Sequence, residues 1–536
     1  MSRSLPGWFL GSAKESVALL KGDKRLFSRC VLSRDHTKWK RTRMGRPSIQ
    51  TCFSYPEYEN NVSTRKSFSS HSTEERVQFQ LSPSYVNHIL RVNELSYKVP
   101  EIDGKNRSTI LKFDSNQLCS NNPCEDRRSA ATCLQNKGHI FGVFDGHAGA
   151  SCAQTISERL FYYIAVSLMP QQTLEEIEYA MEHIKPVFPI LQWHKHKHDY
   201  LYREAASLYI NHLRVYWQEL IDLDNEAGMS VADALTYAFQ RLDSDISLEA
   251  QASTEDVLIR NITLQTAFSG ATACVSHVDG VHLHVANVGD CRAILGVQEE
   301  SGTWSALPLT ADHNAFNKSE VQRIQGEHPP SEAHTVVTDN RLLGVLMPFR
   351  AFGDFGFKWS QQLQKNVLHN ACDLKPLNIY RYSPLNYLTP PYLTAKPEVT
   401  YHKLRPQDKF LVLASDGLWD MMENHEVVKL VADHLLELTF QQPEITVENR
   451  SLGYIHNLLM KRRFKRRQPS DLNVATHLIR NAIGTNECGE LEQEKLVAML
   501  SLPEDIARMY RDDITVTVVF FNSNVIEMHY REIESF

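Results

Sequence analysis

Three acidic residues lie at the ends of strongly apolar segments, and this pattern constrains the fold more than any other feature of the sequence. Two segments are followed by Asp145 and Asp416, and the third begins just after Asp512. The segments are residues 141–144, 411–414 and 514–518. Short apolar runs of this kind favour β-strands. If the third strand is antiparallel to the other two, its start lies beside their ends and the three carboxylates converge.

This convergence, if it occurs, has a chemical consequence. A single Asp-Gly pair after a strand favours only a turn. Three acidic positions, with His147 two residues after Asp145, favour a site instead. Carboxylates at close range repel one another unless cations lie between them. Oxygen ligands without thiols favour Mg²⁺ or Mn²⁺ over Zn²⁺, so we expect a site for hard divalent cations.

Length and composition are those of an ordinary globular protein. The 536 residues favour one large domain with insertions or two medium-sized domains. A net charge of −7 gives no general positive field, so nucleic acid is not an expected partner. The ten cysteines form no C-x-x-C pair, which argues against a disulfide scaffold or a zinc site. No apolar stretch approaches the roughly 20 residues that cross a bilayer, so we expect no membrane span.

The chain begins with a basic segment. Residues 1–50 contain twelve Lys and Arg residues against three acidic ones, interspersed with serines and apolar residues. This composition is typical of a mitochondrial transit peptide, and we interpret residues 1–68 as that peptide and a disordered leader. The alternative is a disordered basic arm that binds an anionic partner.

Periodicity then predicts the elements that follow. Ser82 and Pro83 have the chemistry of a helix start, so we expect a helical lead-in over residues 69–105. The main domain is expected at 106–524, with a C-terminal tail at 525–536. Insertions are expected near residues 170–230, 360–390 and 438–470. Strands are predicted at 140–144, 281–288, 411–414 and 514–521, and helices at 151–168, 231–248, 426–438 and 474–483.

Seven short motifs occur in a fixed order between residues 145 and 515. They are Asp145–Gly149, Ser269–Ala273, Ala286–Ala293, Asp312–Asn314, Arg350–Asp354, Ala414–Asp420 and Asp512–Thr515. In this order they resemble the motifs of the metal-dependent PPM (type 2C) Ser/Thr protein phosphatases. The resemblance implies an α+β fold: an α/β/β/α sandwich in which two antiparallel sheets are flanked by antiparallel helices.

The resemblance also implies roles for particular residues. Two Mg²⁺ or Mn²⁺ ions would be held by four groups: Asp145, the Gly146 carbonyl, Asp416 and Asp512. A hydroxide bridging the two metals would attack the phosphorus in line, and His147 would protonate the departing serine oxygen as general acid. Three further acids match a supporting position or a weaker third-metal position: Glu125, Asp312 and Asp420.

Two positions depart from the family pattern. Many members carry an arginine as a phosphate clamp where this chain has Asn121, so the phosphate-binding residue is unknown from the sequence. The usual Asp-Asn pair near the last strand is here Asp512-Asp513. We expect Arg350 and Asp354 to be structural residues that hold turns beside the metal end.

A narrower resemblance exists to one subfamily, the catalytic subunits of the mitochondrial pyruvate dehydrogenase phosphatases, and more to their second isoform than to their first. It implies a matrix enzyme that dephosphorylates, and so reactivates, the E1 α subunit of the complex. Docking on a lipoyl domain of the acetyltransferase core and a possible regulatory subunit are further implications. The alternatives are a phosphatase for another mitochondrial phosphoprotein and a pseudophosphatase scaffold. The segments that carry it are 101–115, 125–131, 159–168, 191–196, 216–223 and 404–411.

Overall fold

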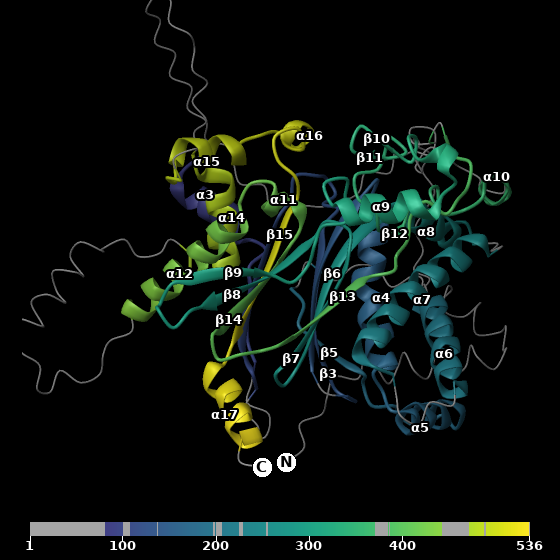
Figure 1. Cartoon of the computed structure of the whole chain (residues 1–536), viewed down its shortest axis with the longest axis horizontal. Helices are drawn as coiled ribbons and strands as arrows, with labels where there is room; N and C mark the ends of the chain where they lie inside the picture. Colours follow the sequence, from purple (N-terminus) through teal and green to yellow (C-terminus); the bar gives the residue numbers. More distant parts are fainter. Residues whose placement is uncertain are drawn as a thin grey trace, which may run out of the picture.

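Two antiparallel sheets form the centre of the molecule (Figure 1). The structure is a computed structural model that describes residues 81–99, 108–136, 138–196, 199, 206–223, 229–252, 256–369, 384, 386–441, 471–486 and 489–534. The first sheet has the strand order β1 (Leu95–Lys98), β2 (Ile110–Leu118), β15 (Ile514–Phe521), β14 (Asp408–Ala414), β8 (Arg292–Gln298), β9 (Trp304–Pro308).

The second sheet packs face to face with the first. Its order is β13 (Glu398–Lys403), β7 (His282–Val288), β6 (Gly270–Asp279), β4 (His139–His147), β3 (Arg127–Cys133), β5 (Leu191–Trp193), and β12 (Phe352–Gly353) pairs with β6. A separate hairpin consists of β10 (Val337–Thr338) and β11 (Arg341–Leu342). The strands predicted from apolar runs are all present as β4, β7, β14 and β15.

Helices cover the outer face of each sheet, on the left and the right of Figure 1. Those beside the first sheet are α3 (Pro83–Arg91), α12 (Asn424–Gln441), α14 (Val474–Gly484) and α15 (Gln493–Leu500). Those on the side of the second sheet are α4 (Ser151–Ser167), α5 (Gln171–Glu182), α6 (Ala206–Asp222), α7 (Val231–Gln251) and α8 (Val257–Phe268). The remaining helices are α9 (Lys318–Glu327), the 3-10 turn η2 (Pro330–Glu332), α10 (Gln361–His369), α11 (Asp416–Trp419), α16 (Glu504–Ala507) and α17 (Ser523–Glu534).

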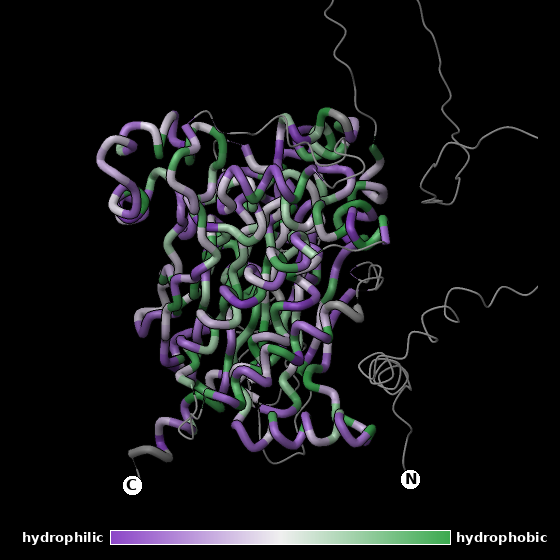
Figure 2. The backbone as a smooth tube through the Cα atoms, turned by 90° about the vertical axis from the view of Figure 1, so that its right-hand side faces the viewer, coloured by the Kyte–Doolittle hydropathy of each residue, from purple (hydrophilic) through white to green (hydrophobic). Residues whose placement is uncertain are grey.

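The apolar runs are continuous because each central strand is buried on both faces. In β4, Phe141 and Val143 point into the core between the sheets, whereas Ile140 and Phe144 point toward the helices. Alternate residues of a strand face opposite sides, so a strand covered on both sides needs apolar residues throughout. In Figure 2 many of the hydrophobic stretches accordingly lie within the body of the molecule. The α/β/β/α sandwich predicted from the sequence is therefore confirmed.

Side-chain caps define where several helices begin. Ser82 accepts a hydrogen bond from the Tyr85 amide at the start of α3, with Pro83 in the first helical position. Ser230 caps α7 and Asn473 caps α14 in the same way. Such caps satisfy amides that lack a partner within the helix. The four helices predicted from periodicity are present as α4, α7, α12 and α14.

The chain around the predicted domain differs in detail from the expectation. The segment expected as a helical lead-in also contains β1, which pairs with β2 as an edge strand. The expected tail forms α17, where Val525 and Ile526 are buried. Both segments contribute to the sandwich because they carry apolar residues that the edges of the core can bury. The proposed leader at 1–68 and most of the insertion near 438–470 lie outside the described residues. In the part of the chain that is described, no helix has both the length and the apolarity that a bilayer crossing requires.

Candidate active site

The three strand ends singled out in the sequence meet at one end of the sandwich. Asp145 lies near the end of β4 in the second sheet, and Asp416 begins α11 directly after β14 in the first sheet. β15 runs antiparallel to β14, with Val516 opposite Ala414, so Asp512 lies close to Asp416. α11 and the start of β15 accordingly lie near each other in Figure 1. The charges of Asp416 and Asp512 both act on Asp145, so the three carboxylates lie near one another at this end of the sandwich.

Electrostatic interactions join these carboxylates into one cluster. Burial, followed by the charge of Asp416, raises the pKa of Asp145 well above its usual range. Burial and the charge of Asp512 raise the pKa of Asp416 to about 7. Asp290 and Asp126 also interact with Asp145. Without cations, the cluster therefore favours partly protonated carboxyl groups.

The donor atoms fit hard divalent cations. The buried Asp416 Oδ1 has no hydrogen-bond partner, which is costly unless another group satisfies it. The side chains of Asp416 and Asp145 interact, and Asp512 forms an ion pair with Arg508. Among the described residues, no group of three or more His, Cys, Asp or Glu side chains has the arrangement of a metal site. The nearby Cys291 thiol has a pKa raised well above its usual range by burial and then by Asp145, so it stays protonated and the donors are oxygens.

Gly146 and Glu125 lie against each other. A Cβ at Gly146 would collide with the Glu125 backbone carbonyl, so only glycine allows the chain to pass here. The Glu125 side chain accepts a 2.6 Å hydrogen bond from the amide of Gly149, at the turn that leads into α4. Burial raises the pKa of Glu125 despite that hydrogen bond. Glu125 thus anchors the turn that directly follows His147.

His147 has a carboxylate partner that the sequence did not reveal. Its Nε2 lies 2.5 Å from Asp354 Oδ2. Burial alone would lower the pKa of His147, but the negative charge of Asp354 outweighs it and raises that pKa above its usual value. Gly270 makes room for the pair, because a Cβ there would collide with both side chains. From the sequence we expected Asp354 only to hold a turn. In the structure it also orients His147 and stabilises its protonated form.

The two departures from the family pattern prove to be connected. The Asp513 carboxylate accepts hydrogen bonds from the amides of Ser120 (2.5 Å), Asn121 (2.9 Å) and Glu125 (2.7 Å). It also accepts one from the Asn121 side-chain amide at 3.1 Å. Asp513 thus holds the loop before β3 in place. Asn121 is part of that support and is turned toward Asp513.

The other acidic candidates lie beside the cluster. Burial, together with the charges of Asp512 and Asp312, raises the pKa of Asp420. Asp312 is held by Arg292, whose guanidinium makes hydrogen bonds of 3.0 and 2.7 Å to its carboxylate. Asp312 therefore has a cationic partner already, whereas Asp420 has no such ion pair in the described structure.

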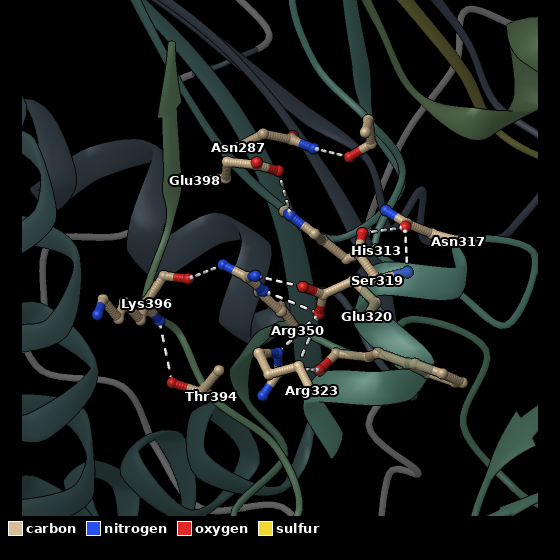
Figure 3. Close-up of polar contacts among 12 residues, drawn as sticks. Asn287, His313, Asn317, Ser319, Glu320, Arg323, Arg350, Thr394, Lys396 and Glu398 are labelled. Atoms are coloured by element: carbon tan, nitrogen blue, oxygen red, sulfur yellow. Dashed lines mark hydrogen bonds and ion pairs between the residues drawn. The ribbon is translucent and has the colours of Figure 1, made fainter. Parts of the chain in front are cut away.

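A polar network braces the segment that follows Asp312 (Figure 3). Its centre is Glu320 on α9, which is contacted by both Arg350 and Arg323. Arg350 also donates a 3.0 Å hydrogen bond to the Lys396 carbonyl. Arg350 is thus a structural residue, as expected, although its carboxylate partner is Glu320 and not Asp354. Burial alone would raise the pKa of Glu320, but its hydrogen bonds with Arg350 and Arg323 lower that pKa to about 2.

Substituting Glu320 should test this network. Glu320→Gln leaves two arginines facing each other in a mostly buried place, so the free energy of unfolding should fall by about 3 kcal/mol at pH 7. The carboxylate stabilises the fold fully above its unfolded pKa of 4.5 and loses this effect as the pH falls toward 2. Urea unfolding of both proteins should therefore show a difference that shrinks below pH 4.5. The control, Glu327→Gln, removes an exposed partner of Arg323 and should change stability by less than about 1 kcal/mol. A difference that does not vary with pH would contradict the assignment.

Comparison with known proteins agrees with this geometry. The family described as protein phosphatase 2C matches residues 192–452, a range that contains Asp416 but neither Asp145 nor Asp512. Human mitochondrial pyruvate dehydrogenase (acetyl-transferring) phosphatase 2 is 54% identical over 534 residues, which cover 99% of this chain and 100% of the relative. Human mitochondrial pyruvate dehydrogenase (acetyl-transferring) phosphatase 1 is 59% identical over 454 residues, 84% of each chain. A protein phosphatase 2C homologue of Schizosaccharomyces pombe is 30% identical over 434 residues, covering 78% of this chain and 82% of the relative. Together with the sandwich and its cluster of carboxylates, these similarities show that the chain belongs to the protein phosphatase 2C family, whose members in general depend on Mg²⁺ or Mn²⁺.

Proposed function

We propose that this protein is a metal-dependent protein serine/threonine phosphatase that dephosphorylates and so reactivates the E1 component of the mitochondrial pyruvate dehydrogenase complex. The observation that carries the proposal is the cluster of Asp145, Asp416 and Asp512 beside His147, in a chain that resembles a phosphatase of that name along its whole length. The similar human phosphatases are mitochondrial, which supports a mitochondrial location, and we propose the matrix in particular.

The residues of the cluster have distinct tasks in this reaction. Asp145, Asp416, Asp512 and the Gly146 carbonyl would hold two Mg²⁺ or Mn²⁺ ions, and Asp420 is the better placed of the two third-metal candidates. When bound, the ions would supply charge neutralisation for the phosphate oxygens and activation of the attacking water. Asp145 would serve as a ligand for both ions. Glu125 supports the turn between Asp145 and α4.

His147 provides the proton for the leaving group. The departing serine oxygen is strongly basic, so the reaction needs an acid that is protonated near neutral pH. Asp354 keeps His147 in that form. Because Nε2 is bonded to Asp354, the proton available for transfer is the one on Nδ1.

The partners follow from the proposed substrate. They are phosphoserines of the E1 α subunit, a lipoyl domain of the dihydrolipoyl acetyltransferase core, and a regulatory subunit. Residues 1–68 act as the targeting segment, followed by the domain at 106–524. The insertions near 170–230 and 360–390, which carry α5, α6 and α10, are candidates for docking because they add surface outside the sandwich.

The test is phosphate release from phosphorylated pyruvate dehydrogenase complex by the purified full chain, with Mg²⁺ and then with excess EDTA. We expect release with Mg²⁺ and none with EDTA. Release from a generic phosphoserine peptide but not from the complex would overturn the substrate and retain the chemistry. No metal-dependent release from either, in a folded protein, would favour the scaffold alternative.

A further inference from the structure

Arg508, which belongs to none of the seven motifs, contacts the carboxylate cluster at Asp512. Arg508 directly follows α16 and precedes β15 by a few residues. Its guanidinium forms an ion pair with Asp512, four residues further along the chain. The side chain is 51% exposed, so it can be reached from solvent while it contacts a predicted metal ligand.

Arg508 interacts with the whole cluster. Besides Asp512, its charge acts on Asp416 and Asp145. It also acts on Glu125 and Asp420, which lie on either side of the cluster. A cation with these neighbours lies where a bound phosphate would need positive charge.

The other arginines at this end of the sandwich are held by protein groups. Arg292 is bonded to Asp312 and, at 2.8 Å, to Asn424. Arg511 is buried and donates to the Ser120 hydroxyl. Arg127 donates to Gln154 and to two backbone carbonyls. Arg508 differs from these three because its side chain is half exposed and, within the described structure, pairs with Asp512 alone.

The position at which many family members carry a phosphate-binding arginine provides no positive charge in this chain. It is Asn121, which is neutral, and both its backbone and side-chain amides donate to Asp513. Asn122, the next residue, donates to Glu504 at 2.5 Å. These contacts direct both asparagines toward protein carboxylates.

We propose that Arg508 binds the phosphate group of the substrate, through two parallel N–H···O hydrogen bonds to its oxygens. This inference rests on the proposed function, because it concerns the same site. An arginine suits the task since its planar fork matches two phosphate oxygens and its charge persists at every accessible pH. The ion pair with Asp512 is then an alternative contact: a cation held by Asp512 would weaken its attraction for the guanidinium and leave Arg508 free to contact the phosphate.

Calorimetric titration of inorganic phosphate into the Mn²⁺-loaded full chain tests the proposal. Arg508→Gln should weaken phosphate binding by about 10- to 100-fold, as expected for the loss of a charge-assisted contact. KM for a phosphoserine peptide should rise to a similar extent. Arg508→Lys should show a smaller loss because it keeps the charge without the fork. The matched control is Arg531→Gln, which removes another exposed arginine with an acidic partner four residues away and should change neither quantity.

Mn²⁺ affinity distinguishes phosphate binding by Arg508 from a role in positioning Asp512. It can be measured by electron paramagnetic resonance, which detects the free Mn²⁺. If Arg508 binds phosphate, Arg508→Gln should bind Mn²⁺ as tightly as the wild type or more tightly, since a competitor for Asp512 is gone. Unchanged phosphate affinity would overturn the proposal. So would a parallel loss of Mn²⁺ and phosphate affinity, which would mean that Arg508 only positions Asp512. A wild type that binds phosphate in this way but hydrolyses no phosphoserine would instead overturn the proposed function.

Discussion

Asparagine in place of Asp145 should lower kcat about a thousandfold and leave the fold intact. The change removes a negative charge that the cluster needs to hold cations, and such charge stabilisation contributes roughly 4 kcal/mol to the transition state. The side chain lies at a strand end and not in one of the hydrophobic cores. In the absence of metal, the variant should unfold at the same temperature as the wild type or a higher one, because a crowded carboxylate is gone.

Two measurements check this prediction. Phosphate release gives kcat, and thermal unfolding with and without Mn²⁺ reports metal binding by its stabilising effect. Mn²⁺ should raise the unfolding temperature of the wild type by more than that of the variant. The control is Asp339→Asn, at an exposed position between β10 and β11, where asparagine suits the positive φ of 52°. Full activity in a folded Asp145→Asn protein would refute the assignment of Asp145 as a metal ligand.

After Asp145→Asn, the substitution Gly270→Ala should cause the largest loss of activity. Gly270→Ala places a Cβ against both His147 and Asp354, so it should separate the pair without altering either residue. Loss of a positioned general acid typically costs roughly 10²–10⁴-fold in rate, and we expect a loss in that range with a phosphoserine peptide. p-Nitrophenyl phosphate should be affected much less, because its leaving group departs without a proton.

The comparison of the two substrates is the decisive readout. A merely structural effect at Gly270 would reduce both activities equally, and that result would contradict the role of His147. Mn²⁺ binding should be unchanged, since Gly270 contacts none of the predicted metal ligands among its nearest atoms. Gly326→Ala is the control, because a Cβ there meets no atom within 4 Å and its position on α9 favours alanine.

The parts of the site that the sequence predicted are those encoded by local patterns. Asp145, Asp416 and Asp512 are each next to an apolar run, and antiparallel pairing alone brings two of them together. The strands and helices of the sandwich were predictable for the same reason, since buried strands need continuous apolar residues and helices need periodic ones.

The parts that the sequence did not predict depend on contacts between distant segments. Asp354 meets His147 across 207 positions, through a gap that Gly270 provides, and no local pattern distinguishes it from the acid of a turn. Arg508 likewise belongs to none of the seven motifs, and the sequence alone does not set it apart from the neighbouring Arg511. Asp513 was visible as a departure from the family, but its hydrogen bonds to the loop at 120–125 could be found only in three dimensions.

The place of β15 in the first sheet makes the enzyme sensitive to the completeness of its own chain. β15 is the last strand in the sequence, yet it lies inside the sheet, with β2 on one side and β14 on the other. A chain that stops before residue 512 would leave two unpaired strand edges and a split core, and would also lack Asp512 itself. Truncated or partly synthesised forms should therefore be unstable as well as inactive. Only molecules that have been synthesised and folded through β15 would then be active in the cell.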